Sequence, residues 1–182
     1  MKIIGFTYRA GVGECGWSVV LKGDSCLLNG RKPLFVPDWT QELCVTPCLV
    51  LRVSRLGKEI SPRYADRYFD AVAPGADFVA MDLLRAAQAK GNSWTPAIAF
   101  DYSLAVGEYE PVPYPALEGR VFAGQELVMT PEEAVAEASK LMTIRQGDLI
   151  YIQARQLPRR VEKEEIIRTI IHGEEKLYCK IK

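Results

Sequence analysis

The segment Leu49-Val50-Leu51-Arg52-Val53-Ser54-Arg55-Leu56-Gly57-Lys58-Glu59-Ile60-Ser61 contains the features that set the fold class. Its first half is a run rich in leucine and valine, which predicts a strand over 48–53, and turn-forming residues follow it. Ser61 and Pro62 then supply a hydroxyl N-cap and a proline at the first helical position, which predicts a helix that ends before Pro74. A strand, a turn and a helix therefore follow one another closely.

Short strands predominate in the rest of the chain. Turn-forming residues bound further predicted strands over 2–7, 17–21, 97–102, 149–153, 166–172 and 176–181. Two more helices are predicted, one from Asp82 to its end at Gly91 and one from the capping box that Thr130 and Glu133 form around Pro131. The helices do not alternate with the strands, so we expect a β-dominated α+β fold with an antiparallel or mixed sheet and about three short helices.

Length and charge limit the classes of protein to which the chain can belong. Its 182 residues suffice for one well-packed core and are few for two, so we expect a single domain over 1–182. Lys plus Arg and Asp plus Glu both total 23, which leaves no excess positive charge for phosphates or an anionic membrane surface. We expect neither nucleic acid nor a membrane as a partner. No apolar run is long enough for a signal peptide or a membrane span, so we place the protein in the cytoplasm.

The cysteines and the histidine give weak signals for chemistry. The five cysteines are scattered, and buried free thiols are the favoured interpretation, although Cys44 and Cys48 could share one face of a strand. Two cysteines without neighbouring ligands are weak evidence for zinc. The single histidine, His172, precedes Gly173 and two glutamates, which indicates a hairpin turn rather than a catalytic base.

A glycine-rich segment raises the alternative of dinucleotide binding. Gly11-Val12-Gly13-Glu14-Cys15-Gly16 has the spacing of a dinucleotide-binding loop, but that function requires a helix directly afterwards. The continuation 17–24 is typical of a strand and a turn. We therefore favour a glycine loop between two strands.

Carboxylates are better candidates for a functional site. Asp77 lies between small and apolar residues, where burial is costly without a partner, so it is either a site residue or a capping or turn residue. Asp101 follows an apolar run that it could simply end. Glu108 and Glu110 would share one face of a strand and could hold Mg²⁺, but Pro111 favours a solvated loop.

Four stretches together resemble the fumarylacetoacetate hydrolase family in order and spacing. The first is Lys2-Ile3-Ile4-Gly5-Phe6-Thr7-Tyr8, which is similar to the family's amino-terminal strand. The second runs from Leu49 to Ser61 and on to Asp77, the position of a metal-binding aspartate. The third is Ala138-Ser139-Lys140-Leu141-Met142-Thr143-Ile144-Arg145-Gln146-Gly147-Asp148-Leu149-Ile150, and the fourth is Phe100-Asp101.

The resemblance implies a mixed β-sandwich roll, a homodimer, and Mg²⁺ or Mn²⁺ chemistry on a small carboxylate-bearing metabolite such as a 2-oxo or β-diketo acid. The family holds its metal with a Glu-x-Glu pair and a later aspartate. By position the aspartate is Asp77, but the pair falls on Thr46 and Cys48, and neither side chain supplies a carboxylate. One carboxylate alone rarely holds Mg²⁺ in a protein site.

Other positions that the resemblance marks are also changed. The family's His-x-x-Glu dyad falls on Gly11 and Glu14, so the glutamate is retained as a candidate catalytic residue and the histidine is lost. Ile98 stands at the position of a substrate-contacting lysine, and Ala154 within a loop that normally carries hydroxyls. The implied substrate pocket therefore comprises Tyr8, Gly11, Thr46, Cys48, Ile98, Asp101 and Ala154.

Two hypotheses remain after this comparison. The first is a diverged protein that lacks the metal-dependent chemistry, binds no required cofactor, and acts in small-molecule binding or assembly. The second is a divalent-metal hydrolase, decarboxylase or isomerase with a rebuilt site, in which Asp77 is joined by another carboxylate. The acidic residues available for that role are Glu42, Asp82, Glu108 and Glu110.

Overall fold

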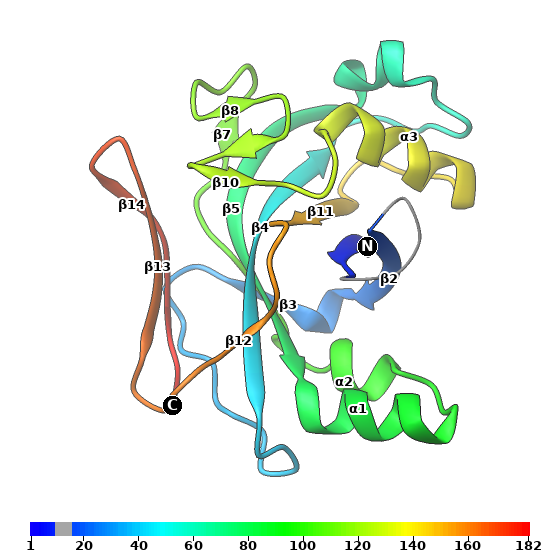
Figure 1. Ribbon diagram of the computed structural model, residues 1–182. Helices are drawn as coiled ribbons and strands as arrows, with labels where there is room; N and C mark the ends of the chain where they lie inside the picture. Colours follow the sequence, from blue (N-terminus) through cyan, green and yellow to red (C-terminus); the bar gives the residue numbers. More distant parts are fainter. Residues whose placement is uncertain (10–15) are drawn as a thin grey trace.

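The computed structural model describes residues 1–9 and 16–182, and its centre is a nine-stranded mixed sheet (Figure 1). The strand order is β2-β1-β11-β4-β5-β6-β3, with β12 beside β4 and β7 beside β5. The strands are β1 (Lys2–Tyr8), β2 (Trp17–Gly23), β3 (Leu27–Asn29), β4 (Leu43–Val53), β5 (Phe69–Ala80), β6 (Leu104–Val106), β7 (Glu110–Pro111), β11 (Leu149–Gln153) and β12 (Arg159–Arg160).

Smaller elements surround this sheet. The other strands are β8 (Leu117–Glu118), β9 (Val121–Phe122) and β10 (Gln125–Glu126), which form one small sheet, and the hairpin of β13 (Ile166–Ile171) and β14 (Glu174–Lys180). The α-helices are α1 (Met81–Lys90), α2 (Thr95–Ile98) and α3 (Pro131–Leu141), and the 3₁₀ helices are η1 (Asp24–Cys26) and η2 (Pro62–Tyr68). The β-dominated α+β fold class is therefore confirmed.

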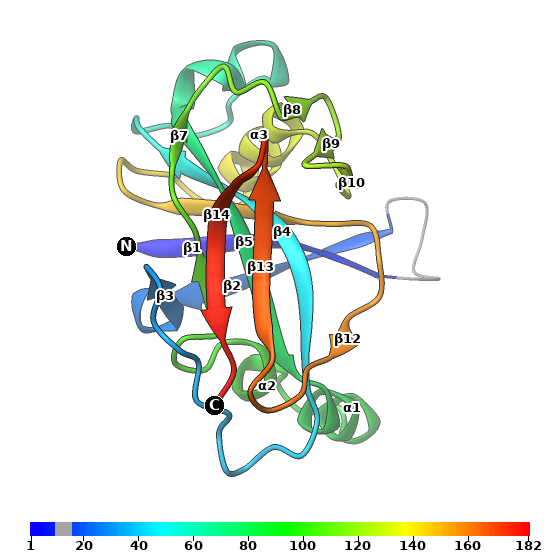
Figure 2. The same ribbon diagram turned by 90° about the vertical axis from the view of Figure 1, so that its left-hand side faces the viewer.

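Strands β4 and β5 form the centre of the sheet and bury both of their faces. Leu49 and Leu51 of β4 pack in the cluster that includes α3, and Val45 packs against the β13–β14 hairpin, which lies over β4 and β5 (Figure 2). Cys48 and Val50 point to the opposite face. Because side chains alternate along a strand, β4 contributes to a separate apolar cluster on each side of the sheet.

Local signals predicted two of the helices well. The capping box of α3 is present, since the Thr130 side chain accepts from the Glu133 N–H and the Glu133 carboxylate accepts from the Thr130 N–H. Helix α1 ends at Gly91, whose φ of 66° is left-handed as expected of a terminating glycine. It begins at Met81 and not from an Asp82 cap, because Asp82 lies inside the first turn.

Two local predictions were wrong. The helix expected between Ser61 and Pro74 is only the 3₁₀ helix η2, after which Phe69 and Val72 already belong to β5. Pairing with β4 buries both side chains, and this tertiary contact overrides their helical spacing. The strand expected over 97–102 is the second half of α2 and a turn, because Pro96 favours the first turn of a helix.

Strand β2 excludes the dinucleotide alternative. Trp17 to Gly23 pair with β1 along their whole length, so no helix begins after Gly16 to face a pyrophosphate. At the other end of the chain His172 (φ 52°) and Gly173 (φ 84°) form the tight turn of the β13–β14 hairpin, as predicted. None of the helices within 1–9 and 16–182 is long and apolar enough to span a membrane.

Candidate functional site

Asp77 lies in a buried part of the sheet because of the register between β4 and β5. It pairs with Thr46 across the two strands, and Cys48 pairs with Gly75. Directly opposite residues in an antiparallel pair point to the same face, so Asp77, Thr46 and Cys48 share one side of the sheet. The three positions that the resemblance assigned to the metal site therefore lie together, and all three are buried.

The positive charge beside Asp77 comes from Lys22 of β2. The Lys22 side chain is 0% exposed, and its Nζ lies 2.7 Å from Asp77 Oδ1. Lys22 Nζ also donates to the carbonyl oxygen of Ser103 (3.0 Å) and to its Oγ (2.9 Å). An ammonium carries three donors, and here three oxygens surround it. The pair therefore meets the requirement that a buried charge has a counter-charge and hydrogen bonds.

Gln153 holds the second carboxylate oxygen. Its Nε2 donates to Asp77 Oδ2 over 2.6 Å, while its Oε1 accepts from the backbone N–H of Tyr8 over 2.8 Å. Because the Tyr8 backbone N–H can only donate, the amide of Gln153 has one orientation, with its N–H group on Asp77. The end of β1 therefore positions the carboxylate through a side chain of β11.

Two further polar groups line the same interior. Among the described residues, Thr46 Oγ1 and Tyr151 Oη are buried without a hydrogen-bond partner, and Asp77 Oδ1 meets Lys22 as an ion pair without a well-directed hydrogen bond. Burial, followed by the negative charge of Asp77, raises the pKa of Tyr151 well above its ordinary value. The same two causes raise the pKa of Cys48 well above its ordinary value. The phenol and the thiol are therefore neutral.

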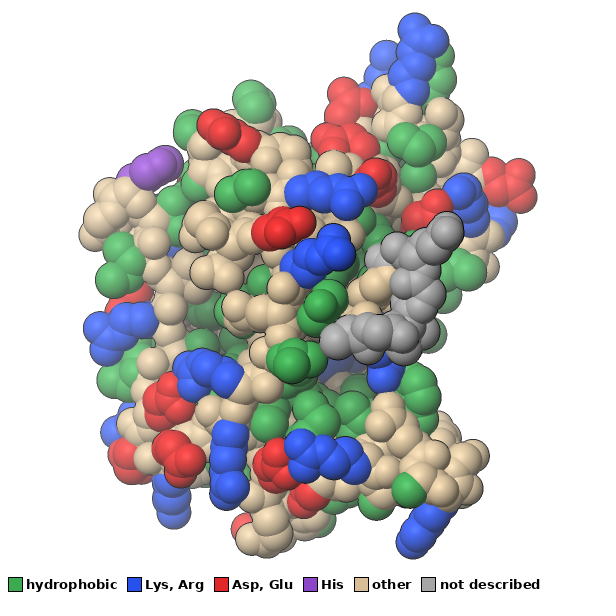
Figure 3. Space-filling model, in the orientation of Figure 1, with side chains coloured by type: hydrophobic (Ala, Val, Ile, Leu, Met, Phe, Trp, Pro, Cys, Tyr) green, Lys and Arg blue, Asp and Glu red, His purple; other side chains and the backbone are tan. Residues whose placement is uncertain are grey.

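A cavity of about 300 Å³ opens beside Asp77, between the sheet and helices α1 and α2. The surface is hollowed at the corresponding place above α1 and α2 (Figure 3). This volume lies at the lower end of the range of small-molecule sites, about 300–1,000 Å³. The cavity is lined by Thr7, Tyr8, Arg9, Val20, Asp77, Phe78, Val79, Met81, Leu84, Arg85, Gln88, Ile98, Tyr151, Gln153, Leu157 and Pro158.

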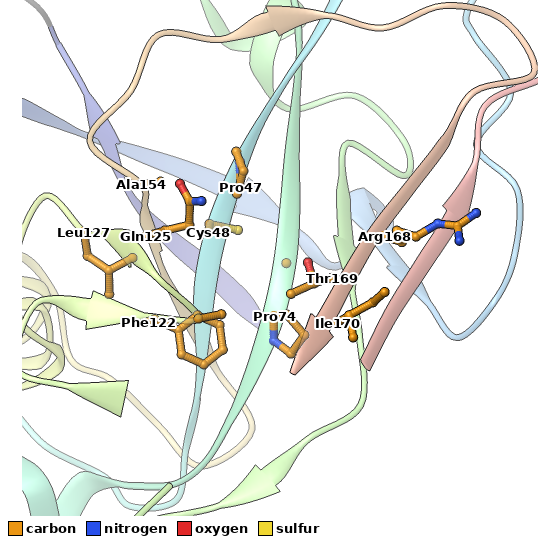
Figure 4. A pocket seen from close by; sticks show the side chains of 12 residues that line it. Pro47, Cys48, Pro74, Phe122, Gln125, Leu127, Ala154, Arg168, Thr169 and Ile170 are labelled. Carbon is orange, nitrogen blue, oxygen red and sulfur yellow. The ribbon is translucent and has the colours of Figure 1, made fainter. Parts of the chain in front are cut away.

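Cys48 and Ala154 contribute to a second cavity of about 250 Å³ under the β13–β14 hairpin. Figure 4 shows Phe122 and Gln125 on one side of it and Ile170 on the other. The predicted substrate pocket is therefore divided, because Tyr8 and Ile98 line the first cavity, beside the predicted metal position Asp77, and Cys48 and Ala154 line the second.

The remaining predicted residues lie elsewhere. Asp101 is exposed in the turn after α2 and lines neither of these two cavities. Gly11 and Glu14 fall outside the described residues, as does Cys15. The other four cysteines are buried and free, as predicted: Cys26, Cys44, Cys48 and Cys179.

The residues around Asp77 do not fit Mg²⁺ or Mn²⁺. These cations prefer several oxygen ligands, and the neighbours at the Glu-x-Glu positions are the Thr46 hydroxyl and the neutral Cys48 thiol. The ammonium of Lys22 is already in contact with Asp77 and would repel a divalent cation there. Within 1–9 and 16–182, no group of three His, Cys, Asp or Glu residues has an arrangement that could hold a metal ion.

The acidic residues that could have rebuilt the metal site are engaged elsewhere. Glu42 forms a two-pronged ion pair with Arg85, with distances of 2.7 and 3.0 Å. Asp82 accepts from Thr40 Oγ1 over 2.6 Å. Glu110 and Glu108 lie 2.6 and 3.9 Å from the Nζ of the same lysine, Lys176.

Comparison with solved structures identifies the fold. The chain is similar to a fumarylpyruvate hydrolase from Pseudomonas aeruginosa, solved in complex with Mn²⁺ and pyruvate, with a TM-score of 0.81 and 22% identity over 99% of this chain and 88% of that one. It is also similar to a 5-carboxymethyl-2-hydroxymuconate delta-isomerase from Mycobacterium smegmatis, with a TM-score of 0.81 and 18% identity over 99% and 78% of the two chains.

The chain therefore has the fold of the fumarylacetoacetate hydrolase family, as its sequence motifs predicted. A structure from Yersinia pestis assigned to that family has a TM-score of 0.84 at 16% identity, over 99% of this chain and 92% of that one. No protein-family sequence model and no curated protein matches the chain. At these identities the comparison establishes the fold alone.

Sequence reasoning missed Lys22, Gln153 and Tyr151. Lys22 was expected at the end of a strand, next to a turn, where a lysine is normally solvated. In the structure β2 instead exposes Leu21 (51%) and buries Lys22 (1%). No local signal gives this orientation, because it depends on the pairing of β2 with β1 and on the approach of Ser103 and Asp77 from distant parts of the chain.

Proposed function

We propose that this chain is a diverged protein of the fumarylacetoacetate hydrolase fold that binds a small carboxylate-bearing metabolite and does not use a divalent metal. The observation that carries the proposal is the contact of 2.7 Å between Lys22 Nζ and Asp77 Oδ1. A tethered ammonium neutralises the one carboxylate that the resemblance assigns to the metal. The protein therefore needs no metal ion to compensate the buried charge of Asp77.

The cavity beside Asp77 supports a binding role. It combines largely apolar walls with a few polar groups held in fixed positions, among them the amide of Gln153. This composition is typical of small-molecule sites. The Pseudomonas protein of the same fold was solved with Mn²⁺ and pyruvate, which makes pyruvate a suitable first probe for this chain.

The competing hypothesis is a metal-dependent enzyme of the same fold with a rebuilt site. It requires at least one carboxylate besides Asp77 to face the cation. The engagement of Glu42, Asp82, Glu108 and Glu110 in other contacts argues against it. We also propose that the chain is a single domain over 1–182, forms a homodimer and acts in the cytoplasm.

Calorimetry with Mg²⁺ and Mn²⁺ at millimolar concentration tests the proposal. We expect no binding to the natural chain and the same pyruvate binding in the presence and absence of EDTA. A positive control combines Lys22→Met with Thr46→Glu and Cys48→Glu, which places three carboxylates on one face of β4 and β5 and should give Mn²⁺ binding. The proposal fails if the natural chain binds Mn²⁺ and Asp77→Asn abolishes that binding.

A further inference from the structure

The cavity beside Asp77 contains one arginine whose charge the described residues do not balance. Three charged side chains line it. Asp77 is compensated by Lys22, and Arg85 is compensated by its two-pronged pair with Glu42. Arg9 forms no ion pair within 1–9 and 16–182. The described lining therefore carries a net charge of about one positive unit, located at Arg9.

Arg9 is held in place by its surroundings. Its backbone N–H donates to the carbonyl of Gly16 over 2.8 Å, and its Nε donates to Ser18 Oγ over 3.0 Å. The guanidinium carbon lies 4.2 Å from the ring centroid of Trp94, a distance typical of stacked cation–π contacts. The hydrogen bond uses Nε, so the two terminal NH₂ groups retain their donors for an anion.

Partial burial makes an anion favourable beside this group. Loss of hydration lowers the pKa of Arg9 from its ordinary value, although the guanidinium remains charged at neutral pH. A planar guanidinium held by stacking loses little entropy when it forms two parallel hydrogen bonds with a carboxylate. Arg9 is therefore preorganised for one carboxylate.

Among the described residues, the rest of the cavity offers no unpaired positive group, since Glu42 already engages Arg85. Its apolar lining comprises Val20, Phe78, Val79, Met81, Leu84, Ile98, Leu157 and Pro158. Asp77 is already paired with Lys22, whose side chain is 0% exposed and does not line the cavity, so neither residue offers a free positive charge to a ligand. A second ligand carboxylate would lose its hydration against apolar side chains without gaining an unpaired cation among the described residues, which is unfavourable.

We infer that the cavity selects small monocarboxylates with an apolar body, that Arg9 binds the carboxylate on its stack with Trp94, and that dicarboxylates are rejected. This inference rests on the proposed function, since it assigns the ligand class of the same cavity.

Benzoate, benzamide and fumarate are matched probes for a titration followed by calorimetry and by tryptophan emission. Benzoate combines one carboxylate with an apolar ring, benzamide removes the charge at nearly constant shape, and fumarate adds a second carboxylate. We expect benzoate to bind with a dissociation constant in the millimolar range or below, and the other two probes to bind at least tenfold more weakly. Trp94 should report benzoate binding by a change in emission that Trp94→Phe removes.

Two arginine variants and one control locate the carboxylate. Arg9→Gln should weaken benzoate at least tenfold, whereas Arg9→Lys, which keeps the charge but not the planar fork, should weaken it less. Arg55→Gln changes an exposed arginine that does not line the cavity and should leave binding unchanged. Circular dichroism of each variant verifies that it is folded.

The outcomes separate this inference from the proposed function. The inference is overturned if benzoate does not bind, or if benzamide or fumarate binds as tightly as benzoate. It is also overturned if Arg9→Gln, like the control Arg55→Gln, binds benzoate with the affinity of the natural chain. If instead benzoate or pyruvate binds only when Mn²⁺ is added, the proposed metal-independent function falls, whatever the contribution of Arg9.

Discussion

Removing the ammonium from the buried Lys22–Asp77 pair should destabilise the protein strongly. Lys22→Met keeps an unbranched apolar chain of similar length but leaves the carboxylate of Asp77, with a side chain 6% exposed, without a counter-charge. Breaking a buried pair by removing one partner typically costs about 3–5 kcal/mol. The loss of two hydrogen bonds to Ser103 acts in the same direction. We expect a decrease in the free energy of unfolding of about 3–5 kcal/mol.

A double-mutant cycle separates the pair from the other contacts of either residue. Asp77→Asn alone leaves the Lys22 ammonium uncompensated and should cost a similar amount. The double variant removes both charges, so it should be more stable than the sum of the single effects predicts, with a coupling energy of about 2–3 kcal/mol. Urea denaturation at pH 7, followed by tryptophan emission and circular dichroism, measures the four free energies of unfolding.

An exposed ion pair provides the control. Arg159 and Glu165 lie 2.7 Å apart with side chains 54% and 27% exposed. Arg159→Met should cost about 0–1 kcal/mol, because solvent screens such pairs. If Lys22→Met costs no more than this control, or if the effects of Lys22→Met and Asp77→Asn are additive, the interpretation of Lys22 as the resident cation of the site is refuted.

Three further predictions concern the elements that support the site. Thr130→Ala removes the cap of α3 and should lower the free energy of unfolding by about 0.5–2 kcal/mol, measured by urea denaturation, while Thr130→Ser should restore most of it. Gly5→Ala should destabilise the protein and disturb the cavity, because a Cβ at Gly5 would lie 2.1 Å from Cζ of Tyr151; an unchanged melting temperature would contradict this. Burial alone would raise the pKa of Asp148, but hydrogen bonds from Lys2 outweigh this effect and lower it. The carboxylate therefore stabilises the fold above the unfolded pKa of about 4, and this stabilisation is lost as pH falls through the lower folded pKa. Asp148→Asn should therefore destabilise the protein at pH 7 and differ little from the natural chain near pH 2, and equal stability at pH 7 would disprove this role.

Local chemistry explains which elements could be predicted from the sequence. The helix after Thr130 was predicted correctly because its capping box satisfies backbone donors within four residues. The helix after Ser61 was predicted incorrectly because pairing with β4 takes Phe69 into a strand. Contacts along one turn of helix depend on neighbours in the sequence, whereas contacts across a sheet depend on a partner strand far away.

The candidate site shows the same division. The resemblance singled out Asp77, Thr46 and Cys48, and the register between β4 and β5 places these three positions on one face of the sheet. The division of the pocket into two cavities was not predictable. Cys48 and Ala154 line the second cavity, and the β13–β14 hairpin forms another of its walls. The position of the hairpin over the sheet is set by packing between segments more than 100 residues apart in the sequence.

The sequence by itself determined the β-dominated fold, the C-terminal end of helix α1, the start of helix α3, and the absence of a Glu-x-Glu pair opposite Asp77, because each follows from residue type at a given position. Only the tertiary structure decided which charge compensates Asp77. Lys22 reaches it because the pairing of β2 with β1 turns Lys22 inward and Leu21 outward. Side-chain orientation in a strand depends on register with its neighbours, and register is a property of the folded sheet.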